Sequence, residues 1–237
     1  MKMHKPFKAR NTFSILLVLM ILSNLFFASC NSTYTSKKKG YYKINFPQRK
    51  YVKFDQPGFP YSFEYPVYAT IEEDSLLSNR KGQDPYSINI DFPSLNGKIY
   101  ITYKIIGQTS IYRVKNTGGG YRDSIGKNVF QNLVNDCYNL TYKNDVKANS
   151  IEDSVMHTPN DITGIFFRLS GSVATAKQFF LSDTTHNFLR GALYFDATPN
   201  EDSLRPVNDF LQEDMKHIIN TLKWKSPSPA ITAKDGK

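Results

Sequence analysis

The chain has 237 residues, 40% of them hydrophobic and 14% aromatic, so it is long and apolar enough to form a domain with a buried core. Its net charge is +9, but residues 1–29 contain four basic residues and no acidic one, and the remaining 26 basic and 21 acidic residues give +5. Much of that excess lies at residues 37–43 and 223–237, so the nearly neutral middle excludes a nucleic-acid-binding face of clustered Lys and Arg.

The N-terminal segment has the three parts of a secretory signal peptide. Basic residues precede an apolar run at residues 13–27, and two small residues follow it. The next residue is Cys30, and a cysteine directly after such a cleavage site is typical of a bacterial lipoprotein. We therefore expect removal of residues 1–29 and attachment of lipid to Cys30, as diacylglycerol on its sulfur together with palmitate.

This signal predicts that the mature chain is anchored to a membrane and does not span it. The apolar run is shorter than the roughly 20 residues that a membrane-spanning helix needs. Two alternatives remain open, namely a secreted protein cut one residue away and an N-terminal anchor that is not cleaved.

Polar and charged residues follow the cysteine, so residues 30–45 are expected to form the acylated Cys30 and a flexible tether. Position 31 is Asn, not the Asp that commonly retains a lipoprotein at the inner membrane, and the tether lacks the acidic cluster that marks surface export. These features predict the outer membrane, with the domain facing the periplasm. Residues 46–225 are expected to form a single globular domain, and residues 226–237 a disordered tail.

The first half of this domain is expected to be rich in strands. Residues 61–65 place three aromatic side chains on one face, with the period of a half-buried strand. Residues 87–92 and 98–106 flank Asn96-Gly97, where positive φ is favourable, so they are expected to pair as a hairpin. Residues 107–126 contain three consecutive glycines and are expected to form an exposed loop.

The second half is expected to hold two helices separated by strands. From residue 127 the apolar residues have helical spacing, and Cys137 lies on the apolar stripe as a small buried residue. Four extended segments follow, at about residues 148–157, 162–169, 174–181 and 188–195.

A second apolar stripe predicts a helix from about residue 201 to 222. Pro206 is tolerated if it lies in the first turn, and His217 is expected to complement the helix dipole at the other end. The fold class is therefore α+β, with one antiparallel sheet and two main helices packed on it.

One cluster of residues suggests catalysis. Ser182, Asp183 and His186 are the residue types of a hydrolase triad, but they lie within five consecutive residues of a turn, and no GxSxG motif is present. A hairpin turn, in which Asp183 accepts backbone hydrogen bonds, is the favoured interpretation. The scattered histidines predict no metal site, and no cofactor is expected.

The tyrosines of the expected strands allow two interpretations. Tyr61, Tyr65, Tyr100 and Tyr103 alternate with apolar residues and suit a hydrophobic core. They would also suit a platform on which the sugar rings of a glycan stack.

Six stretches carry a resemblance to a known family: residues 59–69 (FPYSFEYPVYA), 89–93 (NIDFP), 99–104 (IYITYK), 178–183 (QFFLSD), 188–195 (FLRGALYF) and 199–204 (PNEDSL). Together with the signal and Cys30, they make nearly all of the mature chain resemble the gliding-motility lipoprotein GldD family. The resemblance implies a cell-envelope lipoprotein needed for surface gliding and for the associated type IX protein secretion, without established enzymatic activity. The order of elements also resembles the PsbP-type α/β/α sandwich.

The leading hypothesis is a non-catalytic assembly or stabilising subunit. Its expected partners are the membrane, through the lipid on Cys30, and other gliding and secretion proteins, but no nucleic acid. The first alternative is a docking module that binds peptidoglycan or another glycan. The second is a hydrolase that uses Ser182, Asp183 and His186.

Overall fold

The computed structural model describes residues 17, 20, 43–73 and 85–225. Apart from residues 17 and 20, the expected signal peptide lies outside these residues, as do Cys30, most of the expected tether and the expected tail. The chain divides into two compact units, Met1–Lys43 and Ile44–Lys237, and all the elements described below belong to the second. Within the described ranges, no helix is both long and apolar enough to cross a membrane.

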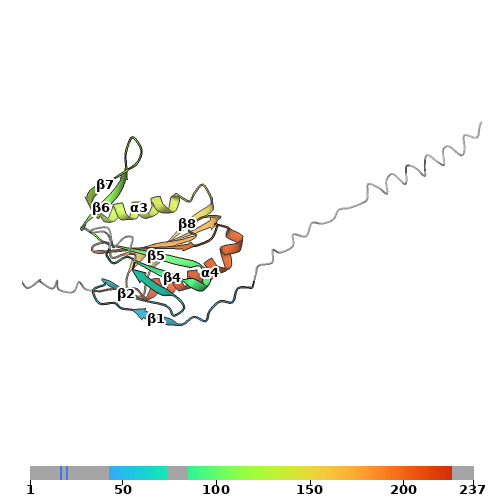
Figure 1. Ribbon diagram of the computed structural model, residues 1–237, viewed down its shortest axis with the longest axis horizontal. Helices are drawn as coiled ribbons and strands as arrows, with labels where there is room; N and C mark the ends of the chain where they lie inside the picture. The colour runs from blue at the N-terminus through green and yellow to red at the C-terminus, as the bar shows by residue number, and fades with distance from the viewer. Residues whose placement is uncertain (1–16, 18–19, 21–42, 74–84, 226–237) are drawn as a thin grey trace, which may run out of the picture. The chain divides into compact units, whose positions relative to one another are not determined.

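A seven-stranded sheet forms the centre of the second unit (Figure 1). All neighbouring strands are antiparallel. In spatial order the strands are β3 (Thr70–Glu73), β4 (Ile88–Phe92), β5 (Gly97–Ile105), β11 (Asn187–Phe195), β10 (Lys177–Ser182), β9 (Thr163–Gly171) and β8 (Ala148–His157). This sheet confirms the four extended segments expected in the second half of the domain.

The expected hairpin is also confirmed, because β4 and β5 are joined by a short 3-10 helix, η1 (Pro93–Leu95), and by Asn96. Asn96 has a φ of 48°, in the left-handed region that Asn tolerates better than most residues. Gly191 in β11 meets a different requirement. A Cβ at this position would lie 2.3 Å from the ring of Phe179 on β10, so only glycine allows the ring to pack there.

A smaller, three-stranded sheet has the order β1 (Tyr51–Phe54), β2 (Tyr61–Pro66) and β12 (Lys223–Trp224). Of these three strands, the sequence predicts only β2. The strand β12 has two residues, which are too few to show a period, and its pairing with β2 brings the C-terminal end of the described chain beside its N-terminal part.

The expectation of an exposed loop at residues 107–126 is wrong. This segment forms a two-stranded hairpin of β6 (Thr109–Lys115) and β7 (Tyr121–Lys127), which extends from the body in Figure 1. The glycines make the turn, since Gly119 and Gly120 both have positive φ. The side chain of Ile125 is 77% exposed, so the hairpin lacks the alternation of buried and exposed residues that would reveal strands in the sequence.

Two helices complete the domain, as expected: α3 (Phe130–Tyr142) and α4 (Glu201–Thr221). The side chain of Asn200 caps α4 by accepting a hydrogen bond from the backbone N–H of Ser203 at 3.0 Å. The helix begins at Glu201 as expected, but Pro206 lies inside it, beyond the first turn in which a proline is tolerated. There its missing N–H costs the helix a backbone hydrogen bond.

The seven-stranded sheet is covered on both faces. On one face, apolar residues of α4, β1 and β2 pack with Ile90, Ile99 and Leu193 in the larger core cluster. On the other face, Leu133 and Cys137 of α3 pack with Phe167 of β9, Phe180 of β10 and Phe188 at the start of β11. The layers are thus α3, the large sheet, and α4 together with the small sheet, which establishes the α+β fold class.

Candidate functional site

Ser182, Asp183 and His186 lie in the turn between β10 and β11. One carboxylate oxygen of Asp183 accepts hydrogen bonds from the backbone N–H groups of residues 185, 186 and 187, at 2.7 to 3.1 Å. The hydroxyl of Ser182 is buried and donates to the carbonyl oxygen of Asn187 at 2.6 Å. The side chain of His186 is exposed. The three residues therefore build a hairpin turn, which is the interpretation favoured from the sequence, and not a triad geometry.

Cys137 lies on the buried face of α3, where it is 3% exposed and packs in the smaller core cluster. Burial raises the pKa of its thiol to about 12, so the thiol stays protonated at neutral pH. The expectation of a buried structural residue is confirmed. Among the described residues, no three His, Cys, Asp or Glu side chains gather in a way that could hold a metal ion.

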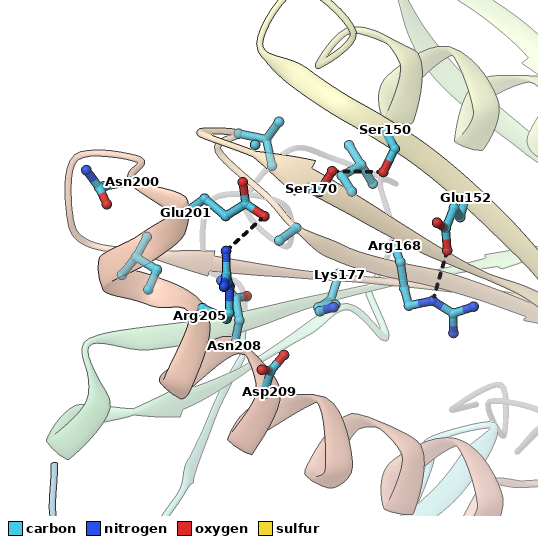
Figure 2. A pocket seen from close by; sticks show the side chains of 15 residues that line it. Ser150, Glu152, Arg168, Ser170, Lys177, Asn200, Glu201, Arg205, Asn208 and Asp209 are labelled. Atoms are coloured by element: carbon cyan, nitrogen blue, oxygen red, sulfur yellow. Dashed lines mark hydrogen bonds and ion pairs between the residues drawn. The ribbon is translucent and has the colours of Figure 1, made fainter. Parts of the chain in front are cut away.

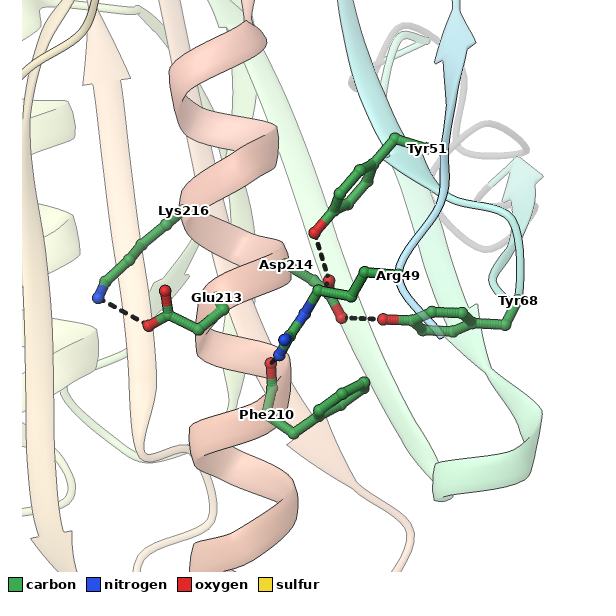
Figure 3. A network of polar contacts seen from close by, with 7 residues as sticks. All are labelled: Arg49, Tyr51, Tyr68, Phe210, Glu213, Asp214 and Lys216. Carbon is green, nitrogen blue, oxygen red and sulfur yellow. Dashed lines mark hydrogen bonds and ion pairs between the residues drawn. The ribbon is translucent and has the colours of Figure 1, made fainter. Parts of the chain in front are cut away.

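A buried carboxylate joins the start of the described domain to α4 (Figure 3). Asp214 of α4 is fully buried and accepts hydrogen bonds from three side chains. The hydroxyl of Tyr51 donates to Oδ1 at 2.9 Å, Nε of Arg49 donates to the same atom at 3.3 Å, and the hydroxyl of Tyr68 donates to Oδ2. We call these four residues the Asp214 clasp.

Aromatic contacts strengthen the clasp. The Arg49 guanidinium lies 4.2 Å from the centre of the Phe210 ring and donates a hydrogen bond to the Phe210 carbonyl oxygen at 2.9 Å. On its other side, the Phe210 ring is stacked with Phe46 at 4.3 Å between centroids. Residues 46–51, which directly follow the expected tether, are therefore held against one side of α4.

His217 belongs to this same side of α4. It was expected in the last turn of the helix, beside the negative end of the dipole, but the last turn of α4 contains no basic residue. The imidazole of His217 is stacked on Tyr51, with ring centroids 3.5 Å apart, and its Nε2 lies 2.9 Å from a carboxylate oxygen of Glu64. Tyr51 and Glu64 lie on the strands β1 and β2, and the sequence spacing alone does not show that either strand packs beside α4.

The protonation state of the clasp follows from its burial. Burial, together with the hydrogen bond to Asp214, raises the pKa of Tyr51 to about 12, and the same two causes raise the pKa of Tyr68 further. Both hydroxyls therefore remain donors at neutral pH. The clasp is a stable structural connection at physiological pH.

The part of the large sheet that α3 leaves uncovered forms an open basin of about 800 Å³. It is lined by Tyr100 and Tyr194, and by side chains of both charges, namely Asp91, Lys98, Arg190 and Asp196. The two rings meet edge to face, with centroids 5.5 Å apart and an interplanar angle of 82°. We call this surface the tyrosine basin.

The tyrosines singled out from the sequence thus separate into two groups. Tyr61 and Tyr103 are buried in the larger core cluster and Tyr65 packs partly against it, whereas Tyr100 is 41% exposed. Sequence reasoning did not connect Tyr194 with Tyr100, because the two are 94 positions apart and meet only through the pairing of β5 with β11.

A smaller hollow of about 200 Å³ lies between the first half of α4 and the strands β8, β9 and β10 (Figure 2). Its charged side chains pair with one another, Arg168 with Glu152 at 3.8 Å and Arg205 with Glu201 at 3.6 Å. Lys177 is partly buried there, and burial lowers its pKa. The first pair joins β9 to β8 and the second lies within α4, so the charges on each side of the hollow are paired within their own layer.

Comparisons with known proteins place the chain in a family. Among solved structures, it is similar to the solution structure of cyanobacterial PsbP (CyanoP) from Synechocystis sp. PCC 6803, with 8% sequence identity, a TM-score of 0.40, and coverage of 80% of this chain and 99% of that one. No curated protein matches the chain. A family model described as gliding motility lipoprotein GldD matches residues 31–224, which is most of the chain. The chain therefore belongs to the gliding motility lipoprotein GldD family.

Proposed function

We propose that this protein is a non-catalytic subunit of the gliding machinery that also serves the associated type IX protein secretion. The observation that carries the proposal is the family match, which begins at residue 31, directly after Cys30. That boundary supports a mature chain that starts at Cys30 and is held at the membrane by lipid on this residue. Its protein partners are then other components of the gliding and secretion machinery.

The arrangement of the domain supports an assembly or stabilising role. The Asp214 clasp holds the residues after the tether against α4, so a load on the tether would pass directly to the longest described helix. The residues that most suggest hydrolysis, Ser182 and Asp183, are instead engaged with the backbone of their own turn.

The proposal assigns each part of the chain a role. Residues 1–29 direct export, residues 30–45 form the acylated tether, residues 46–225 form the working domain, and residues 226–237 form a tail. The absence of Asp at position 31 and of an acidic cluster in the tether supports the outer membrane, with the domain facing the periplasm.

The test is a Cys30→Ala substitution at the natural locus, with Cys137→Ala as the matched control because it removes the other cysteine. We expect Cys30→Ala to move the protein out of the detergent-soluble membrane fraction and to abolish gliding, whereas Cys137→Ala keeps both. Fractionation with immunoblotting and measurement of colony spreading report the two outcomes. Full gliding with a Cys30→Ala protein that has left the membrane would disprove the anchored role.

A further inference from the structure

We propose that the tyrosine basin is a glycan-binding site, in which Tyr100 and Tyr194 stack against a sugar ring and the surrounding polar side chains bind its hydroxyl and amide groups. Glycan binding at this surface would add a ligand to the proposed assembly role of the protein. The proposed location in the cell envelope decides only which glycan the protein would meet in the cell, and the binding site itself does not depend on it.

The basin exists because α3 covers less of its face of the large sheet than α4 and the small sheet cover of the other face. The strands β4, β5 and β11 are covered over their full length on the α4 side, where Ile88, Ile101 and Leu189 are buried. On the other side, α3 reaches only as far as the end of β11 near Phe188. The uncovered face extends over β4, β5 and β11. In the strand pairing, Asn89 of β4 lies opposite Tyr100 of β5, which lies opposite Ala192 of β11.

The exposed Tyr100 and the half-buried Tyr194 differ from the core tyrosines in how their hydroxyls are used. In the core, Tyr61 donates to the carbonyl oxygen of Tyr86 and Tyr103 donates to the side chain of Asn187. In the part of the chain that the structure describes, Tyr100 and Tyr194 contact each other only through their rings, so their hydroxyls stay available. An edge-to-face pair leaves ring surface for the C–H face of a sugar, the apolar side that carbohydrates present to aromatic groups.

The charges around the basin select a neutral polar ligand. Two acids, Asp91 and Asp196, balance two bases, Lys98 and Arg190, whereas a site for phosphate or nucleic acid would carry an excess of basic residues. Lys98 is also held in place by Glu72 at 3.1 Å. A ligand with both donors and acceptors, such as an N-acetylated sugar, matches this mixture.

Two amide side chains beside the basin have polar atoms without a partner among the described residues. Gln178 is 1% exposed, and its Oε1 accepts hydrogen bonds from Arg190 and from Thr141 of α3, but its Nε2 is unsatisfied. On the far side of Tyr100, Oδ1 of Asn89 is also buried and unsatisfied. Both atoms are buried and neither residue lines the basin, so the contacts of a ligand are expected with the exposed parts of Tyr100, Tyr194 and Arg190.

The test measures binding of a tetramer of β-1,4-linked N-acetylglucosamine to the full chain purified in detergent, by isothermal titration calorimetry. We expect saturable binding that weakens by roughly tenfold or more in Tyr100→Ala and Tyr194→Ala, because each removes one ring of the platform. The matched control is Tyr142→Ala on α3, which removes a tyrosine of similar exposure, 47%, and should bind as the native chain does.

Folding and binding are separated by a second variant. Tyr100→Leu keeps an apolar side chain over the sheet but removes the aromatic face, so it should retain the native melting temperature and still lose binding. Absence of saturable binding to the native chain, or an equal loss in Tyr142→Ala, would overturn the proposal. Capture of a protein partner that depends on Tyr100, without any glycan binding, would identify the basin as a protein interface and would also overturn it. None of these results affects the outcome expected for Cys30→Ala.

Discussion

At the scale of single residues, Asp183 and Cys137 have the side chains that most suggest a catalytic role. The structure holds each of them in a protonation state and a set of contacts that do not favour reaction. Burial by itself would raise the pKa of Asp183, but the hydrogen bonds from residues 185–187 outweigh it and hold the pKa below its usual value. The carboxylate thus stays charged at neutral pH, and its stabilisation of the turn is lost only as the pH falls through that lowered pKa. Cys137 is protonated, and a thiol reacts chiefly as the thiolate.

This difference gives a test of both cysteines. If Cys30 is acylated and Cys137 is buried, the mature native chain should not react with a thiol reagent at neutral pH, and denaturant should expose one reactive thiol. Titration with a chromogenic disulfide reagent, before and after denaturation, measures this. A thiol that reacts in the native state would contradict one of the two assignments, and Cys137→Ala would show which one.

At the scale of secondary-structure elements, the hydrogen bonds to the Asp214 carboxylate connect three segments that are distant in sequence. Arg49 precedes β1, Tyr68 follows β2, and Asp214 lies in the middle of α4. Because the carboxylate is fully buried, its desolvation is offset only while all three donors remain in place. Arg49 is partly exposed, so its own charge stays hydrated and the two tyrosine hydroxyls are the more dependent partners.

We expect Asp214→Ala to lower the free energy of unfolding by roughly 2–4 kcal/mol, because it leaves the hydroxyls of Tyr51 and Tyr68 without an acceptor. The control is Glu213→Ala on the exposed side of the same helix, which removes a surface pair with Lys216 and should cost less than about 1 kcal/mol. Urea denaturation measures both. Equal losses in the two variants would show that the clasp contributes nothing beyond a surface ion pair.

At the scale of the whole molecule, stability depends on burial on both faces of one sheet. Cys137 is the free cysteine of the described chain, so packing and hydrogen bonding, not an internal disulfide, hold this part together. Tyrosines contribute to this stability both in the core and in the Asp214 clasp. Burial raises the pKa of Tyr61 and Tyr103 in the core and of Tyr51 and Tyr68 in the clasp, which means that the folded state favours their protonated forms.

This predicts a protein that loses stability in alkali. An unfolded tyrosine ionises near its ordinary pKa of 10.0, whereas Tyr51 in the folded state ionises at about 12. The stabilisation is therefore complete below pH 10 and declines as the pH rises through the folded pKa values. Circular dichroism and phenolate absorbance followed together should show unfolding coupled to ionisation, with a smaller effect in Tyr51→Phe. Complete ionisation without loss of structure would contradict the assignment.

Local periodicity in the sequence was sufficient to predict most elements. The turn at Asn96, the four strands of the second half and both helices follow from residue spacing and turn chemistry, and from them the α+β class. The hairpin of β6 and β7 could not be predicted in this way, because it projects from the body, its exposed Ile125 breaks the usual alternation, and its glycines indicate only a turn.

The sequence by itself determined which side chains share a face of each strand or helix, since a period of 2 or 3.6 is a property of the local backbone. Only the tertiary structure decided what covers each face. Tyr100 and Tyr103 lie on opposite faces of β5, and the unequal reach of α3 and α4 makes one a surface residue and the other a core residue. The partners of Asp214 were likewise decided by tertiary packing, because contacts between residues more than 140 positions apart leave no periodic signal in the chain.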